Sequence, residues 1–256
     1  MSHLLVTRTA TAFLLSVFLL STGCIKMEHD LRILEDGTAT YRLKYSISEQ
    51  AITQLRAMEK LKADLAKANG EPPPGIEMDP LFHLFLDPNE GALREAIKQY
   101  ENDGIKLKSL EIESRSAWRN VDIRIEVDDL EKVSKTEFFK THGFNLTQDA
   151  ESRYVLSRDP HINIPGQVAK VPSDEELKQM IPLVAGFNVT VKITTPGRIL
   201  ATTAFRTTLH TASWTFNFDN EPSAIQAVQR QPFRIVFESK KTPLPEMHYR
   251  GSKITQ

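Results

Sequence analysis

The stretch DLRILEDGTATYRLKYSI, residues 30–47, has the pattern of two strands joined by a tight turn. Apolar and polar side chains alternate in both halves, as they do in a strand with one buried face. The Asp36-Gly37 pair between the halves tolerates the positive φ angles of a hairpin turn. We therefore expect a β-hairpin whose apolar side chains are Leu31, Ile33, Tyr41, Leu43, Tyr45 and Ile47.

Helical periodicity follows the hairpin. We expect Ser48 to cap a helix that runs to about Ala68, since apolar residues recur there at spacings of three and four. These residues are Ile52, Leu55, Met58, Leu61 and Leu65. A second helix is expected to have Asp87 as its N-cap and to end at Gly104. Its apolar residues are Leu93, Ala96, Ile97 and Tyr100.

The rest of the chain continues with short strands and helices. A second hairpin is expected over 105–127, where the alternation slips between Leu107 and Leu110. Further strands are expected near 144–146, 153–156, 187–193, 199–205, 214–218 and 233–237, with helices over 128–139 and 173–185. No strand–helix–strand repeat is present, so we predict an α+β fold, an antiparallel β-sheet built from hairpins with amphipathic helices packed on it. Residues 239–256 are expected to form a flexible polar tail that adds nothing to the core.

The first 23 residues have the pattern of a secretory signal. A weakly basic start with Arg8 precedes the uncharged stretch ATAFLLSVFLL, residues 10–20, and then the small residues Ser21, Thr22 and Gly23. This order is typical of a cleaved signal peptide. The apolar stretch is shorter than the about 20 residues that a membrane-spanning helix needs. The chain is therefore expected to be exported.

Cys24, the single cysteine of the chain, follows this signal directly. The sequence LSTGC, residues 20–24, resembles the lipobox of bacterial lipoproteins, although Ser21 stands where that family usually has Leu, Val or Ile. The resemblance implies a diacylglyceryl group on Cys24, cleavage before it and usually acylation of the new N-terminus. It divides the chain into a cleaved signal peptide (1–23), one envelope domain (24–238) and the tail. The alternative is an ordinary buried or free cysteine in an uncleaved N-terminal anchor.

The residue after the cysteine bears on which membrane would hold the anchor. In enterobacteria-like lipoproteins an Asp at this place signals retention in the inner membrane, and here the residue is Ile25. The outer membrane is therefore favoured if the organism has one.

Composition and motifs argue against several functions. The net charge of −1 and the absence of a basic stripe do not favour nucleic acid as a partner. No glycine-rich phosphate loop, GxSxG or HExxH motif is present, and the seven histidines are isolated in the sequence. A metal site normally needs three or four convergent ligands. We therefore expect no catalytic residues, metal or cofactor, and a hydrolase assembled from distant residues is the last alternative.

A second resemblance rests on three loose motifs. Gly37 in the opening hairpin, the Pro196-Gly197 turn and the strand with Trp214-Thr215-Phe216 resemble the LppM-like class of bacterial envelope lipoproteins. In that class an acylated N-terminal cysteine carries an α+β domain. The resemblance implies an envelope location and binding of lipid or glycolipid, and it implies no enzymatic activity.

Two functions fit these observations. The first is a non-catalytic, membrane-anchored lipoprotein whose domain binds a lipid or another apolar ligand. The second is a structural or assembly factor of the envelope that acts through protein contacts. Candidate ligand-binding residues come from the most apolar run after the signal and from a late aromatic strand, and for each the alternative is a plain core position. They are Leu81, Phe82, Leu84, Phe85 and Trp214.

Overall fold

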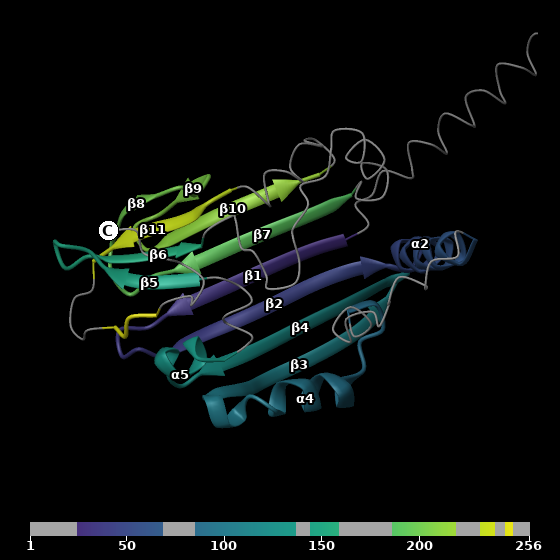
Figure 1. The fold of residues 1–256 in the computed structure, drawn as a ribbon, viewed down its shortest axis with the longest axis horizontal. Helices are drawn as coiled ribbons and strands as arrows, with labels where there is room; N and C mark the ends of the chain where they lie inside the picture. The colour runs from purple at the N-terminus through teal and green to yellow at the C-terminus, as the bar shows by residue number, and fades with distance from the viewer. Residues whose placement is uncertain are drawn as a thin grey trace, which may run out of the picture.

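The computed structural model describes residues 25–68, 85–136, 144–158, 186–218, 231–238 and 244–247. The signal peptide, Cys24, the expected helix over 173–185 and the three residues Leu81, Phe82 and Leu84 lie outside these ranges. The described part is mostly β-strand with a few helices, which agrees with the α+β class. Figure 1 shows its main feature, a large sheet with a smaller sheet and helices in front of it.

Two predicted hairpins form one half of the large sheet. The first joins β1 (Ile25–Ile33) to β2 (Ala39–Ser48), and Gly37 in its turn has a φ of +82°. The second joins β3 (Ile105–Arg115) to β4 (Trp118–Val127). The pairing of β3 with β4 shifts register between Leu107 and Ser109, a β-bulge at the predicted slip. Because β2 pairs with β4, the two hairpins lie side by side.

The other half of the large sheet corrects the prediction of an antiparallel sheet. Strand β7 (Phe187–Thr194) pairs with β1 in parallel, with Phe187 opposite Ile25. Strands β10 (Thr211–Asn217) and β9 (Arg206–Thr207) continue the sheet, whose order is β3-β4-β2-β1-β7-β10-β9. The sheet is therefore mixed. Hairpin patterns predict only the pairing of strands that are consecutive in sequence. The second neighbour of β1 is β7, which lies far along the chain, so its pairing could not be predicted in this way.

A second, smaller sheet also departs from the expected single sheet. It contains β5 (Phe144–Gln148), β6 (Tyr154–Arg158), β11 (Phe233–Phe237) and β8 (Ile199–Thr202), in that order. The predicted turn after β7 therefore leads into another sheet and not into a hairpin partner. At this crossing a Cβ on Gly197 would lie 1.3 Å from the carbonyl oxygen of Glu238. Glycine allows the chain to pass this close to the end of β11.

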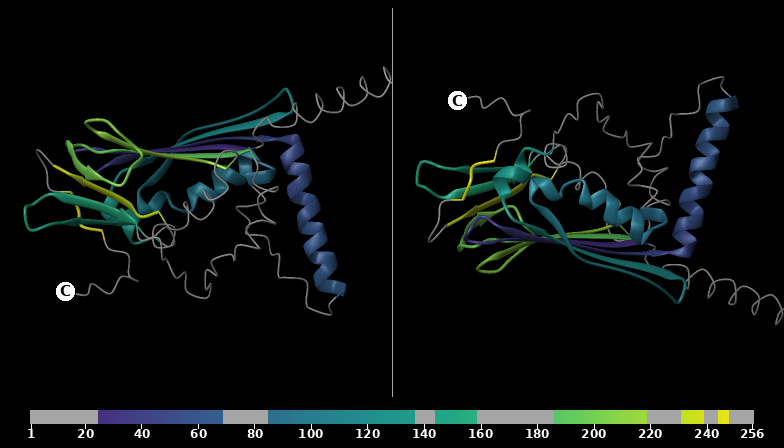
Figure 2. Two further views of the ribbon diagram at one scale, coloured as in Figure 1. Left: turned by 90° about the horizontal axis from the view of Figure 1, so that it is seen from above. Right: turned by 90° about the horizontal axis from the view of Figure 1, so that it is seen from below.

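The helices and the small sheet lie on the same side of the large sheet (Figure 2). We call this side the inner face of the large sheet. Helix α2 (Glu49–Ala68) begins with the predicted cap, because the Ser48 hydroxyl accepts a hydrogen bond from the Ala51 amide at 3.1 Å. Helix α4 (Glu90–Lys98) is followed by the 3-10 turn η1 (Glu101–Asp103), and α5 (Leu130–Ser134) is one short turn. The N-cap of α4 is Asn89 and not Asp87, whose carboxylate binds two arginines instead.

Two apolar clusters fill the space on the inner face. The sheet-covered cluster lies between the large and small sheets and is centred on the fully buried Trp214 and Phe237. The helix-covered cluster packs α2, α4 and the residues around Leu86 onto β1, β2, β3 and β4, with Ile47 and Ile52 fully buried. The partly buried Ile97, Ile125 and Phe187 contact both clusters and so join them.

One segment of the expected tail belongs to this core. Leu244 and Met247 are buried in the sheet-covered cluster, and Met247 exchanges two backbone hydrogen bonds with Leu146 of β5. The prediction that 239–256 adds nothing to the core is therefore wrong for residues 244–247. Their apolar side chains are isolated among prolines and charged residues, and this spacing has neither the strand nor the helix period.

The outer face of the large sheet is polar. Every second residue of β1, β2, β4 and β7 turns away from the clusters, and these residues include several ion pairs. Arg42 of β2 binds Asp122 of β4 through two guanidinium nitrogens, and Lys192 of β7 lies 2.6 Å from Glu28 of β1. The large sheet therefore has one apolar face and one solvated face.

Candidate functional site

Between the two clusters, the described segments cover the inner face of the large sheet incompletely. Rows of apolar side chains from β1, β2 and β7 cross this region. Their middle residues are partly exposed, whereas the end residues Ile25, Ile33, Ala39, Ile47 and Ile193 are buried. We call the middle residues the floor, and they are Met27, Leu31, Leu43, Val189 and Val191. A contiguous, partly exposed apolar surface of this kind is typical of a binding site.

A hydrogen-bonded pair lies in the centre of the floor. His29 stands opposite Leu43 in β2 and Val191 in β7, and its Nδ1 lies 2.7 Å from the Tyr41 hydroxyl. Burial raises the pKa of Tyr41 well above its usual range, so the phenol stays protonated at neutral pH. The pair therefore satisfies a polar hydroxyl within an apolar surface and disfavours the phenolate that a nucleophile or base would need.

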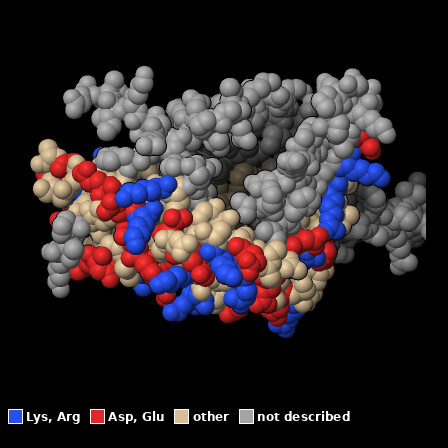
Figure 3. All heavy atoms as spheres, turned by 60° about the horizontal axis from the view of Figure 1, so that its bottom comes forward, with Lys and Arg blue, Asp and Glu red and all other residues tan. Residues whose placement is uncertain are grey.

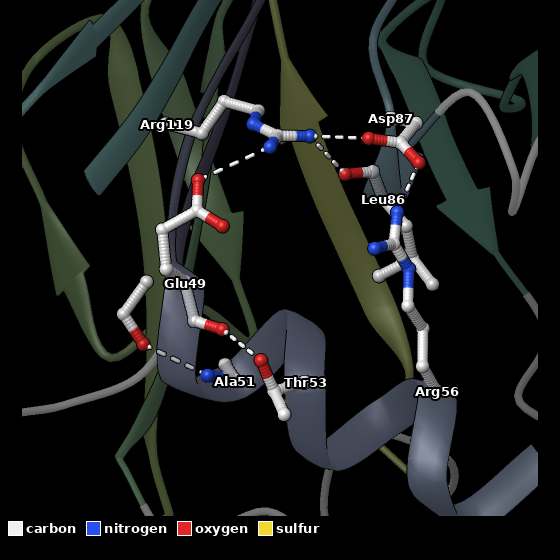
Figure 4. Close-up of polar contacts among 8 residues, drawn as sticks. Glu49, Ala51, Thr53, Arg56, Leu86, Asp87 and Arg119 are labelled. Carbon is white, nitrogen blue, oxygen red and sulfur yellow. Dashed lines mark hydrogen bonds and ion pairs between the residues drawn. The ribbon is translucent and has the colours of Figure 1, made fainter. Parts of the chain in front are cut away.

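Arginine 119 closes the helix-covered end of this face. Its guanidinium donates to the carbonyl oxygen of Leu86 and to Asp87, both at 2.7 Å, and to Glu49 at 3.1 Å (Figure 4). Arg56 of α2 binds the other oxygen of Asp87. These hydrogen bonds keep the pKa of Asp87 below its usual range, chiefly through Arg119. The network fixes the start of α2 and the segment before α4 to β4, which is a structural role.

Arginine 158 lies in the small sheet, between two rings of the sheet-covered cluster. It is the last residue of β6, and alternation places its side chain on the same face as the buried Tyr154 and Leu156. The guanidinium carbon lies 5.8 Å from the ring centres of both Phe144 and Phe233. Its Nε is buried without a hydrogen-bond partner, and burial lowers the pKa of the side chain.

The structure separates the two described candidate ligand residues. The Phe85 ring packs on Tyr45 in the helix-covered cluster, with ring centres 4.7 Å apart. Trp214 is 0% exposed in the sheet-covered cluster, where its Nε1 donates to the Thr203 carbonyl oxygen at 3.1 Å. Trp214 is therefore a core residue in this structure, and it offers no surface to a ligand. The roles suggested for Leu81, Phe82, Leu84 and Cys24 stay predictions.

Sequence reasoning did not single out the floor, the His29–Tyr41 pair or Arg158. The strand alternation contains the signal for the floor, since Leu31, Leu43 and Val191 were already assigned to apolar strand faces. Whether such a face is covered depends on the packing of distant segments, and a single sequence does not show it. Arg158 ends a short strand and carries no motif. It lies between two rings only because β6 pairs with β5 at Phe144 and with β11 at Phe233.

The described ranges contain neither a metal-binding cluster nor a membrane-spanning helix. These ranges hold no group of three or more His, Cys, Asp or Glu side chains placed to bind a metal ion. Among the same residues no helix is both long and apolar enough to cross a bilayer. On the face seen in Figure 3, basic and acidic side chains are interspersed, without a large surface of one sign.

Comparison with known proteins gives a weak structural likeness. No family model matches the chain, and no curated protein sequence matches it. Among solved structures, the chain is similar to the NMR structure of the folded domain of LppM from Mycobacterium tuberculosis, with a TM-score of 0.37 and 7% identity over 87% of this chain and 93% of that one. LppM belongs to the class that the loose motifs resemble. At this TM-score the likeness carries no argument about fold or function.

Proposed function

We propose that the chain is a lipid-anchored lipoprotein of the bacterial cell envelope, whose α+β domain binds a lipid or another apolar ligand without catalysing a reaction. The observation that carries the ligand proposal is the partly exposed apolar floor between two well-packed clusters. Aliphatic side chains and a hydrogen-bonded tyrosine suit an acyl chain, and burying them under a ligand is favourable by about 25 cal/mol per Å² of apolar surface.

The anchor proposal rests on the lipobox resemblance. Because β1 begins directly after Cys24, the proposal also implies how close the domain lies to the membrane. Ile25 is 3% exposed and already paired with Ile47, which faces Arg119 in β4. Ile25, which follows Cys24 directly in the sequence, is thus already part of the large sheet. An acylated Cys24 would hold this end of the large sheet against the membrane with no spacer. Two or more buried acyl chains give stable anchoring.

Cys24→Ala tests the anchor. Expressed as the full chain in a bacterium, this variant should lose the membrane-bound, cleaved form and accumulate unprocessed, because the acylated sulfur is missing. Intact mass spectrometry of the wild type should show the diacylglyceryl adduct. A cleaved variant that still fractionates with membranes would show that Cys24 is not the anchor.

A pair of variants on one strand tests the ligand site. Val191 and Thr190 are neighbours in β7, and only Val191 belongs to the floor. Val191→Glu places a carboxylate on the apolar surface and should abolish the lipid adduct that native mass spectrometry detects on the purified full chain. Thr190→Glu on the outer face should keep it. Equal adducts in both variants, with both folded by circular dichroism, would exclude the floor as the site.

A different surface favours the alternative function, an assembly factor that acts through protein contacts. Around β8 and β9, Phe205 is 54% exposed and Leu209 is 60% exposed. Exposed apolar side chains that lie together are typical of protein interfaces. If the wild-type chain carries no lipid adduct, and a cross-linked envelope partner is lost in the double variant Phe205→Ser, Leu209→Ser, the alternative replaces the ligand proposal.

A further inference from the structure

Arg158 is a half-buried cation, with its Nε fully buried, to which the described structure gives no counter-ion. Within the described ranges no carboxylate forms an ion pair with it, and its Nε has no hydrogen-bond partner. The lowering of its pKa has burial as its only cause, so no nearby acid offsets the desolvation. The neighbouring Arg153 on the same hairpin differs, because Asp149 accepts a hydrogen bond from its Nε at 2.8 Å.

A charged group buried in this way costs stability unless something pairs with it. The site partly offsets the cost through the rings of Phe144 and Phe233, since an arginine plane can stack on aromatic faces. An aromatic ring is not a strong hydrogen-bond acceptor. The N–H groups of the guanidinium therefore remain able to donate hydrogen bonds to an anion. Arginine is also the side chain that best matches the planar, two-oxygen geometry of carboxylate and phosphate.

A chain of neighbouring residues leads from Arg158 to the floor. Phe233 packs on Trp214 with ring centres 4.8 Å apart, and Trp214 lies beside Val191 in the large sheet. Ring contacts thus connect the arginine to the floor. Strand β6, which ends at Arg158, also runs toward the middle of the molecule (Figure 1).

We propose that Arg158 binds the acidic headgroup of the ligand, a carboxylate or a phosphate, while the acyl chain lies on the floor. This inference rests on the proposed lipid-binding function and narrows it from any apolar ligand to an anionic lipid. The guanidinium donates two hydrogen bonds to the headgroup oxygens, and the rings on either side exclude water from the pair. A neutral lipid leaves the cation unpaired and binds more weakly.

The test compares three probes on the purified full chain. Oleate carries a carboxylate, dioleoyl phosphatidic acid carries a phosphate, and diolein is the neutral counterpart. Native mass spectrometry titrations should show the wild type binding at least one anionic probe tenfold or more tighter than diolein. The stronger of the two anions identifies whether the headgroup is a carboxylate or a phosphate.

Two arginine variants isolate the role of Arg158. Arg158→Met should remove the preference for anions and leave diolein binding unchanged, whereas Arg153→Met on the same hairpin should keep the preference. Arg158→Met should also raise the thermal midpoint of the ligand-free protein by a few degrees, because an unpaired buried cation is replaced by an apolar side chain of similar length. An arginine with a purely structural role would lower that midpoint instead.

The outcomes separate this inference from the function on which it rests. If no probe binds the wild type, the lipid-binding function itself fails. If all three probes bind with equal affinity, or if Arg158→Met weakens diolein as much as the anions, lipid binding stands and the role of Arg158 in headgroup recognition is refuted.

Discussion

The two ends of the large sheet are covered in different ways. At the helix-covered end, the buried Ile52, Leu86 and Leu93 come from segments that directly follow the first hairpin or precede the second. At the sheet-covered end, the small sheet is assembled from the β5–β6 hairpin, β8 and β11, and these three parts are separated by other elements and by long stretches of chain. One cover is therefore local in sequence and the other is not.

This difference concerns both stability and function. The sheet-covered end buries large aromatic side chains against one another, whereas the helix-covered end has smaller apolar residues and a polar network around Arg119. Between them lies the floor, which neither cover reaches completely. We expect the sheet-covered end to supply more of the stability and the helix-covered end to open more readily.

The largest effect is expected at the sheet-covered end. Trp214→Ala removes a fully buried indole and its hydrogen bond to Thr203, and it should lower the free energy of unfolding by about 3–5 kcal/mol. Urea unfolding measures the change. Phe205→Ala is the control, because this side chain is largely exposed and its loss should cost about 1 kcal/mol or less. Equal losses would contradict the ranking of these positions by burial.

A smaller effect is expected at the helix-covered end. Ile52→Ala truncates a buried side chain of α2 and should cost about 2–4 kcal/mol, while Thr53→Ala on the exposed side should change stability by about 0.5 kcal/mol or less. Hydrogen exchange adds a spatial readout. Exchange should accelerate in α2 and α4 before the small sheet. Simultaneous acceleration everywhere would mean that Ile97, Ile125 and Phe187 couple both clusters into one unit.

The polar network at the same end should matter less than the cluster. Arg119→Met removes hydrogen bonds to Leu86, Asp87 and Glu49, and we expect a loss of about 1–3 kcal/mol in urea unfolding. The guanidinium of Arg119 is mostly buried, whereas that of Arg56 is exposed. Arg56→Met should therefore cost about 0–1 kcal/mol. A larger loss of stability in Arg56→Met than in Arg119→Met would show that Arg56, and not Arg119, is the main attachment of α2.

The smallest effect belongs to the outer face, which touches neither cluster. The hydrogen bonds from Arg42 hold the pKa of Asp122 below its usual range, so the folded state favours the charged carboxylate. The contribution is complete above the pKa of the unfolded chain, about 3.9, and is lost as the pH falls through the lower folded-state pKa. Asp122→Asn should cost about 0.5–1 kcal/mol at pH 7, and the difference should shrink below about pH 4. A difference that stays constant down to pH 2 would rule out the ion pair as its source.

The comparison also explains how much of the structure the sequence predicts. The two hairpins, the bulge after Leu107 and the Ser48 cap follow from alternation, turn chemistry and capping, and all of these are local. The parallel pairing of β7 with β1 and the small sheet depend on contacts between distant segments, which a local pattern does not encode. Asn89 replaces Asp87 as a cap because Asp87 is engaged by Arg119 and Arg56 across the fold.

For the candidate site too, the features set by local pattern were predictable and those set by contacts between distant segments were not. Apolar faces on the strands were predictable, and the choice of Phe85 and Trp214 as ligand contacts followed from hydrophobicity alone. Hydrophobicity does not distinguish a covered face from an open one, so Trp214 was placed in the site although it lies under Phe233. Arg158 was not recognised because its unusual property, burial without a partner, exists only in three dimensions.

The parallel pair of β1 and β7 has a consequence for how the chain folds. Strand β1 can pair with β2 as soon as the first hairpin is made, but its other edge has to wait until β7 has been synthesised and brought back to it. Until then an unpaired edge remains exposed in the middle of the future sheet, where another chain could add to it. Such late, long-range closure slows folding. The sheet therefore closes last at its centre, so any factor that protects this protein during its synthesis or export is expected to shield β1.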